Sequence, residues 1–406
     1  MEWIPERDCS QENTYLNTKL RQIKLIPPEY EGREQTYIKH IFLTNYLKEL
    51  AFKVLIGRSD VLNYVDAFAG PWGNLDNLGL SDTSFNLALQ TLDLVKAKLE
   101  EIKRPRKIRF CFCEKNEESF RKLKKYTDEH QEYDIKIFKG KFEENLENIN
   151  HWCRNGFTFS FIDPTGWNID SESILKFLRD QNGEFLINFM AEDINRWATF
   201  SQVSKSVGLF LANPEWEPEF ENLPKEWNNE KRILTLLKKK IKESGAANYT
   251  PDIPILKPRE NRVKMRLLLG TNNPKGLEVF RDVQEPVERL EIRTRTKVSN
   301  RGLSTLFDHT DELTELDHKS EGIGSEKYIE KAKNKIEQYL VQNGPSRFSD
   351  ISIIILENFS IRRIHLNDLV KQMKQQGKVT FDLPPKRRIP QNDTVISITK
   401  GKNTLF

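Results

Sequence analysis

The sequence predicts an α/β protein with a mostly parallel sheet, helices on both of its faces, and a small C-terminal domain. Short apolar runs alternate with longer amphipathic segments along most of the 406-residue chain, as strands and crossover helices do in a parallel sheet. Several runs end in an acidic residue or a glycine, as expected at the ligand-binding edge of such a sheet. About the last eighty residues change to three helical segments and two short β-like runs.

The first predicted element is a helix over 36–58, where apolar residues recur at helical spacing and a glycine lies near the end. Strands are predicted at 61–67, 107–113, 134–138, 157–162, 184–190 and 265–271. Amphipathic helices are predicted between them at 82–102, 116–128, 143–153 and 171–180. The segment 291–297 alternates in polarity and is predicted as a last strand.

These elements predict four parts of the chain. Residues 1–60 form an N-terminal helical cap, and residues 61–297 form the core with an insertion at 198–262. Residues 298–325 are polar and poor in large apolar side chains, which predicts a linker. Residues 326–406 contain three helical segments and two β-like runs, K-V-T-F and V-I-S-I, which is the outline of a winged helix.

Composition excludes several classes of protein. No apolar run approaches the roughly 20 residues needed to span a membrane. The N-terminus lacks the pattern of a secretory signal, so we expect a cytoplasmic protein. The four cysteines form no C-x-x-C pair, which predicts neither a metal site nor a disulfide framework. The net charge of +4 favours no partner by itself.

The most informative segment is L-N-Y-V-D-A-F-A-G-P-W-G, at residues 62–73. An apolar strand ends at Asp66, and Gly70 and Gly73 follow in a turn before a helix. Glycine permits close approach of a ligand, and a carboxylate accepts its hydroxyl or amine groups. The segment resembles the first motif of S-adenosylmethionine-dependent methyltransferases in its D-x-F-x-G form. The resemblance implies that Asp66, Phe68, Gly70 and Gly73 bind the cofactor, whereas a purely structural strand–turn–helix corner is the alternative.

Two further segments are predicted to complete the cofactor site. Glu114 ends the second predicted strand, where a carboxylate can hold both ribose hydroxyls. Phe142 follows the third strand and can pack on an adenine ring. A helix N-terminal acid explains Glu114 equally well, and a core phenylalanine explains Phe142.

The segment F-S-F-I-D-P-T-G-W-N, at residues 159–168, predicts the target side of the site. Asp163 and Pro164 end an apolar strand, and Trp167 follows close to the sheet edge, where an aromatic face can stack on a base. Nucleic-acid amino-methyltransferases carry D-P-P-aromatic here, so Thr165 departs from their pattern. Asn188, which ends the fifth strand, is the fourth predicted catalytic residue. A rigid turn with a core tryptophan is the structural alternative.

As a set, these segments resemble the three-Cys-motif partner family (TcmP). The resemblance covers about residues 30–285 and includes Y-I-K-H, D-A-F-A-G-P, F-I-D-P-T-G-W, L-I-N-F-M-A-E-D-I-N-R-W and T-N-N-P-K-G-L-E. It implies a Rossmann-like class I methyltransferase core, a C-terminal winged helix, and a partner protein bearing three cysteines. The family usually reads D-A-F-A-G-P-G and D-P-F-G, so Trp72 and Thr165 are departures at the predicted site.

Three functions remain open on the sequence. The first is an S-adenosylmethionine-dependent methyltransferase acting on nucleic acid. The second is a non-catalytic nucleotide- or partner-binding regulator whose winged helix reads DNA. The third is a nuclease that uses Asp66, Glu114 and Asp163 on magnesium. The biological pathway, phage defence or RNA modification, also stays open.

The C-terminal segment concentrates positive charge. Residues 361–406 contain ten Lys or Arg and three Asp, a balance of +7 in a chain of net +4. Lys386, Arg387 and Arg388 stand between the two β-like runs, at the tip of the predicted wing. These three residues are predicted to bind nucleic acid through its phosphates, whereas a basic surface that only keeps the domain soluble is the alternative.

Overall fold

A seven-stranded sheet in the order β3-β2-β1-β4-β5-β7-β6 forms the centre of the core. The computed structural model describes residue 27 and residues 30–70, 80–164, 166–192, 194, 201–299 and 310–399. Strands β1 to β5 pair in parallel, whereas β7 is antiparallel to both β5 and β6. The strands are β1 (Val61–Asp66), β2 (Lys107–Glu114), β3 (Asp134–Lys139), β4 (Phe157–Ile162), β5 (Gly183–Phe189), β6 (Asp252–Leu256) and β7 (Val263–Gly270).

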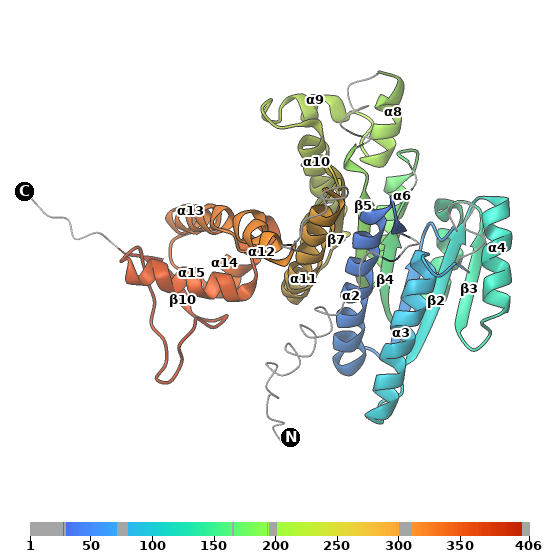
Figure 1. The fold of residues 1–406 in the computed structure, drawn as a ribbon, viewed down its shortest axis with the longest axis horizontal. Helices are drawn as coiled ribbons and strands as arrows, with labels where there is room; N and C mark the ends of the chain where they lie inside the picture. The colour runs from blue at the N-terminus through green and yellow to red at the C-terminus, as the bar shows by residue number, and fades with distance from the viewer. Residues whose placement is uncertain are drawn as a thin grey trace, which may run out of the picture.

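Helices cover both faces of the sheet (Figure 1). One buried apolar cluster unites the sheet with α2 (Glu34–Gly57), α3 (Ser84–Glu101), α4 (Glu117–Asp128) and α11 (Pro274–Ser299). A second cluster unites it with α5 (Leu146–Cys153), α6 (Ser171–Asp180), α8 (Ser201–Phe210), α9 (Trp216–Glu221) and α10 (Asn229–Glu243). The α/β class, the parallel sheet and its helical layers are therefore confirmed.

The strand order reverses beside β1. The chain leaves β1 through α3 to β2 on one side and later returns to pair β4 with the other side of β1. A crevice opens at the carboxyl ends of the strands where such a reversal occurs, because the two crossovers lead away from each other. Asp66 and Asp163, which end β1 and follow β4, lie at this point.

The strand predicted at 291–297 is wrong, because these residues belong to the helix α11. The buried residues Val287, Glu291, Thr294 and Val298 recur at helical spacing. The alternating polarity of the segment therefore did not reflect its burial. Helical periodicity becomes visible only when the segment is extended back to Val287.

Two predicted boundaries are also corrected. The predicted insertion at 198–262 contains β6, an edge strand of the main sheet that pairs only with β7. Pro254 lies in β6 and is tolerated there because an edge strand has one unpaired side. The predicted linker 298–325 contains the helix α12 (Thr310–Glu321), whose neighbour in the fold is α11.

The C-terminal unit, residues 326–399, has its own apolar core. It contains α13 (Glu326–Asn343), α14 (Phe348–Asn358) and α15 (Arg363–Gln375), together with three short strands. The strands β8 (Ser346–Arg347), β9 (Val379–Thr380) and β10 (Val395–Ile398) form an antiparallel sheet in the order β8-β10-β9. The three predicted helices and both predicted β-like runs are present, whereas β8 was not predicted.

One buried arginine joins the C-terminal unit to the core. Arg281 of α11 is 2% exposed and donates to the backbone carbonyls of Leu356 and Glu357 at 2.8 and 3.1 Å. These carbonyls belong to the last turn of α14, where a helix leaves its carbonyls unpaired and favours a cation. Gln284 adds a hydrogen bond to Ser360 at 3.0 Å. The orientation of the C-terminal unit is therefore specified by directional contacts.

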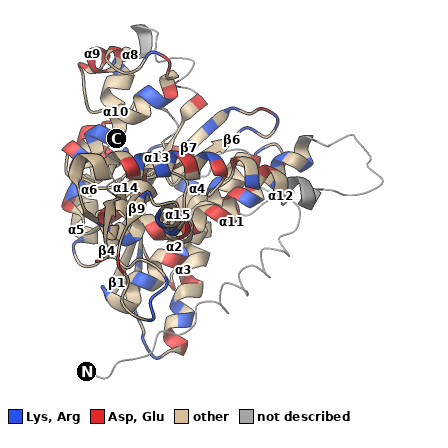
Figure 2. Ribbon diagram, turned by 90° about the vertical axis from the view of Figure 1, so that its left-hand side faces the viewer, with Lys and Arg blue, Asp and Glu red and all other residues tan. Residues whose placement is uncertain are grey.

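Charged residues of both signs are mixed over most elements of the ribbon (Figure 2). None of the helices in the described part of the chain has an apolar stretch that could span a lipid bilayer.

Candidate functional site

The side chain of Asp66 is fully buried at the carboxyl end of β1. Its Oδ2 accepts a hydrogen bond from the Ser84 hydroxyl at 2.7 Å, and its Oδ1 accepts from the Phe68 N–H at 3.2 Å. Ser84 is the first residue of α3, so the carboxyl group also lies at a helix N-terminus. These contacts fix the turn that leads from β1 toward Gly70.

Burial raises the pKa of Asp66 to about 7 from its ordinary value of 3.8. Hydrogen bonds from Ser84 and from the Phe68 N–H oppose that rise, the charge of Asp163 adds to it, and Lys39 opposes it. Asp66 therefore changes its charge near neutral pH. A cation bound at this edge would favour its ionised form.

Gly70 allows Glu114 to approach the turn after β1. A Cβ atom placed on Gly70 would lie 2.0 Å from Oε2 of Glu114, which is far inside contact distance. Glu114 is itself buried at the end of β2, and Oε1 accepts a hydrogen bond from the Asn116 N–H at 2.5 Å. Burial raises the pKa of Glu114, although hydrogen bonds and Lys115 oppose that rise. The glycine and the acid predicted from separate motifs thus form one structural pair.

A pocket lies between the ends of β1, β2 and β3. Phe68, Glu114 and Phe142 all line it, together with Gly140 and Ile169. Phe142 is buried and its ring packs edge-on against Phe177, with centroids 5.4 Å apart. The pocket holds about 100 Å³, whereas small-molecule sites typically measure about 300–1,000 Å³. A nucleoside ligand would therefore extend beyond it along the edge at Gly70.

Asp163 lies at the centre of a polar group at the carboxyl end of β4. Its Oδ1 accepts a hydrogen bond from the Asn188 amide at 2.6 Å. Its Oδ2 forms an ion pair with Lys39 of α2. Lys39 is buried, so α2 contributes a cation to the site as well as covering one face of the sheet. The structure therefore brings together Asp163 and Asn188, two of the residues proposed from the sequence.

Trp167 is partly buried after the end of β4. Its ring packs edge-on against Phe210 at 4.6 Å and against Phe189 at 6.1 Å. Both partners belong to the second apolar cluster, which supports the structural interpretation of this tryptophan, and its stacking role stays a prediction. Pro164 is buried beside it. Gly73 falls outside the described residues.

Two functional candidates were not among the predicted site residues. Ser84 binds Asp66 directly, and a hydroxyl residue at the start of the helix after the glycine turn was the available signal. Lys39 lies 124 positions before Asp163, and no local pattern predicts which helical lysine reaches a distant strand end. His40, next to it, is buried against the Tyr30 hydroxyl at 3.0 Å. Burial, with the neighbouring Lys39, holds the pKa of His40 well below its usual range.

The magnesium hypothesis requires several acidic ligands around one ion. In the described part of the chain, no group of three His, Cys, Asp or Glu side chains could hold a metal ion. Asp163 is already paired with Lys39, and Asp66 with Ser84. The side-chain arrangement therefore does not favour a nuclease built on Asp66, Glu114 and Asp163.

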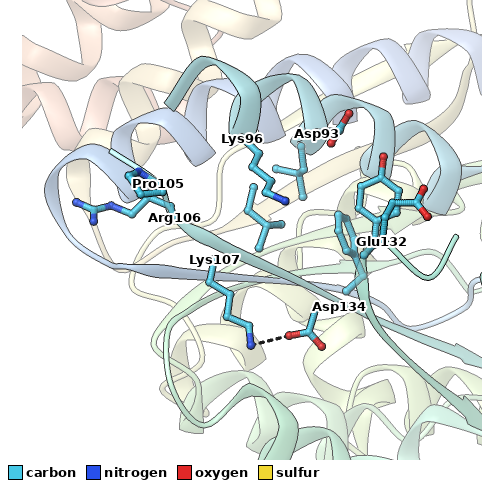
Figure 3. A pocket seen from close by; sticks show the side chains of 11 residues that line it. Asp93, Lys96, Pro105, Arg106, Lys107, Glu132 and Asp134 are labelled. Atoms are coloured by element: carbon cyan, nitrogen blue, oxygen red, sulfur yellow. Dashed lines mark ion pairs between the residues drawn. The ribbon is translucent and has the colours of Figure 1, made fainter. Parts of the chain in front are cut away.

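A separate hollow of about 330 Å³ lies where β2 and β3 begin, at the edge of the sheet away from Asp66 (Figure 3). Its charged lining is mixed, with Asp93, Glu132 and Asp134 against Lys96, Arg106 and Lys107. Lys107 and Asp134 neutralise each other at 2.8 Å. This balance selects no class of ligand.

Comparisons with known proteins find distant similarity to solved structures. No family model matches the chain, and no curated protein matches it. A protein from Legionella pneumophila is 14% identical with a TM-score of 0.32 and covers 59% of this chain and 85% of its own. A protein assigned as an O-methyltransferase from Klebsiella pneumoniae is 9% identical with a TM-score of 0.30, covering 65% and 97%. A loganic acid methyltransferase with S-adenosylhomocysteine is 10% identical with a TM-score of 0.27, covering 69% and 88%.

Replacing Gly70 with alanine should displace the Glu114 carboxylate, because the new Cβ would overlap its Oε2. We expect Gly70→Ala to lower the free energy of unfolding by about 1–3 kcal/mol, the usual cost of overpacking. In the Glu114→Ala background the same substitution should cost much less, because the overlapping atoms are gone. Urea denaturation of the four proteins in this double-mutant cycle measures the difference. Equal costs in both backgrounds would show that overlap with Glu114 does not cause the loss of stability.

The raised pKa of Asp66 predicts a pH dependence of stability. Between about pH 4 and pH 7 the unfolded chain has lost the Asp66 proton while the folded chain keeps it. The free energy of unfolding should therefore fall as the pH rises, by up to about 1.4 kcal/mol per pH unit from this group. Denaturation of Asp66→Asn across this range should show a shallower fall. The exposed helix cap Asp170→Asn serves as control, and an unchanged slope in Asp66→Asn would contradict the assignment.

Proposed function

We propose that this protein is an S-adenosylmethionine-dependent methyltransferase that acts on nucleic acid. The observation that carries the proposal is the meeting of Phe68, Glu114 and Phe142 around one pocket, beside the buried Asp66 at the strand-order reversal. Phe68, Glu114 and Phe142 come from three segments predicted separately, and a doubly wound sheet binds ligands at this edge.

The residues present fit the cofactor. Gly70 lets the Glu114 carboxylate lie against the turn after β1, because any Cβ there would strike it. Glu114 would accept the ribose hydroxyls, Phe142 would contact the base, and Asp66 would favour a cationic methionine end. S-adenosylmethionine supplies an electrophilic methyl group when bound. The chain's own contribution is to position the acceptor and to hold its proton.

Asp163 and Asn188 would face the acceptor. Asp163 is held by Asn188 on one oxygen and by Lys39 on the other, so its orientation is fixed from both sides. A carboxylate fixed in this way can accept a proton or a hydrogen bond from the acceptor group. Lys39 would act through Asp163 as a positioning residue.

The non-catalytic alternative also has an observation in its favour. Trp167, which was expected to stack on a target base, is packed against Phe210 and Phe189. A core that binds a nucleotide or a partner without transferring a methyl group needs no such stacking residue. Under this alternative the pocket at Glu114 would still bind its ligand, and Asp163 substitutions would leave that binding unchanged.

The partner and the C-terminal unit complete the proposal. The sequence resemblance supports a partner protein that carries the three-cysteine motif. The three helices and small antiparallel sheet of the C-terminal unit support a winged helix that docks on nucleic acid. Lys386, Arg387 and Arg388 are exposed in the loop between β9 and β10, where a wing tip would contact phosphates.

Isothermal titration with S-adenosylmethionine tests the cofactor assignment. We expect micromolar affinity, about −7 to −8 kcal/mol. Glu114→Ala should weaken binding by about 1–3 kcal/mol, because it leaves buried ligand hydroxyls unpaired. Glu117→Ala removes a nearby acid from the surface of α4 and should bind normally. The absence of both heat and a thermal shift at excess ligand would refute the cofactor assignment, and normal binding by Glu114→Ala would refute the ribose role.

Salt dependence tests the wing. Replacing Lys386, Arg387 and Arg388 with alanine should flatten the plot of log affinity for duplex DNA against log salt by about three units, if each residue binds one phosphate. The matched control removes three exposed cations of α4, Arg121, Lys124 and Lys125. Fluorescence anisotropy with the full chain measures both slopes. If the wing variant behaves like this control, the wing does not bind nucleic acid. The C-terminal unit would then be proposed as the binding surface for the protein partner.

A further inference from the structure

A basic hairpin stands beside the candidate site. It joins β6 to β7 over residues 257–262 and closes with a backbone hydrogen bond from Lys257 to Arg262 at 2.9 Å. Residues 257–266 contain five basic residues and one acidic residue. Figure 2 shows basic residues along this hairpin beside β6. Arg259 and Arg262 are exposed, and Lys264 is one-third exposed, so three cations face solvent.

A single carboxylate organises the hairpin. Glu192, only 7% exposed, pairs with Lys257 at 2.6 Å and with Arg262 at 2.9 Å through Oε1, and with Lys264 through Oε2. Hydrogen bonds from Lys257 and Lys264 hold the pKa of Glu192 low, at about 2. One negative charge therefore fixes three positive charges at one place. Glu260 adds a second negative charge to the hairpin, with contacts of 3.4 Å to Lys257 and 3.6 Å to Arg262.

The hairpin lies at the same edge of the sheet as Asp163. β6 runs parallel to β5, so the end of β6 and the start of β7 lie at the carboxyl edge. Glu192 follows the end of β5 by three residues, and Asn188 in β5 binds Asp163. Two strand spacings separate β7 from β4, or ~10 Å. That distance corresponds to only a few nucleotides along a strand.

We propose that this hairpin binds the phosphate backbone of the nucleic acid whose reactive group enters the crevice at Asp163. The proposal rests on the proposed function for its class of target. Arginine forks match phosphate oxygens, and Arg259 and Arg262 supply two of them. The loop sequence K-P-R-E-N-R carries no large apolar side chain that could insert into a lipid surface. In Figure 1 the loop between β9 and β10 projects away from the edge that carries α8, so the wing does not supply these contacts.

Nucleic-acid binding by the full chain tests the proposal without S-adenosylmethionine, so its failure is separate from failure of the cofactor site. Arg259→Ala with Arg262→Ala should reduce the salt slope for a single-stranded 30-mer by between one and two units, and the affinity at low salt at least tenfold. The matched control removes two exposed cations of α4, Arg121 and Lys124. The wing triple variant provides the comparison for contacts made elsewhere.

Glu260→Gln provides a test of opposite sign. It removes an exposed carboxylate from the hairpin, and we expect it to strengthen binding and steepen the salt slope. Weaker binding by the double-arginine variant together with stronger binding by Glu260→Gln would establish the hairpin contact. The proposal is overturned if both variants bind like the α4 control. It is also overturned if the arginine substitutions change binding to phosphatidylglycerol vesicles or polyglutamate but not to nucleic acid.

Discussion

The pairing of β1 with later strands on both of its sides is the constraint on which the site depends. β2 and β4 pair with β1 in parallel, one on each side of it. The crossovers that follow β1 and β3 therefore lead to opposite sides of β1. A crevice is expected at the carboxyl end of β1 where the two crossovers lead apart. Asp66, Glu114 and Asp163 then reach one edge without any local sequence relation between them. This arrangement buries Asp66, and burial disfavours its charged form. The hydrogen bond from the Ser84 hydroxyl offsets part of that effect.

The sequence predicted most of this arrangement, because strands of a parallel sheet are buried on both faces. Runs such as F-T-F-S-F-I in β4 are apolar throughout, and their ends are marked by a change to acid, glycine or proline. Glu114 and Phe142 could be assigned to one site for a geometric reason. If the strands are parallel, their carboxyl ends share an edge, so residues at those ends meet whatever their separation in sequence.

The errors have physical causes as well. The helix α11 buries the polar residues Glu291 and Thr294 along its packed face, so its apolar stripe is interrupted where a strand was predicted. The strand β6 is a short edge strand with a proline, and such strands carry few of the usual signals. The packing of Trp167 depends on Phe210 of α8, and no local pattern places that helix beside the segment after β4. Lys39 reached Asp163 through the same kind of long-range packing.

The charges of the site are divided between two depths. The acids that end β1 and β2 are buried, and burial raises the pKa values of Asp66 and Glu114. Lys39 is a buried cation on Asp163, whereas the exposed cations belong to the hairpin around Glu192. Such a gradient draws an anionic chain to the rim while leaving the interior suited to hydroxyl and ammonium groups.

The rigid attachment of the C-terminal unit limits how the two basic surfaces can work together. Arg281 fixes α14 through buried hydrogen bonds to its last carbonyls, and Arg362 pairs with Asp282 at 3.0 Å at the same junction. The wing loop and the β6–β7 hairpin therefore keep their separation, and in Figure 1 the wing loop projects away from the edge that carries α8. A longer or bent nucleic acid could contact both, or else each surface serves a different partner. If one nucleic acid contacts both surfaces, removal of the wing and the hairpin together should weaken binding of a long substrate strongly. That loss should exceed the loss that either removal causes for a short substrate.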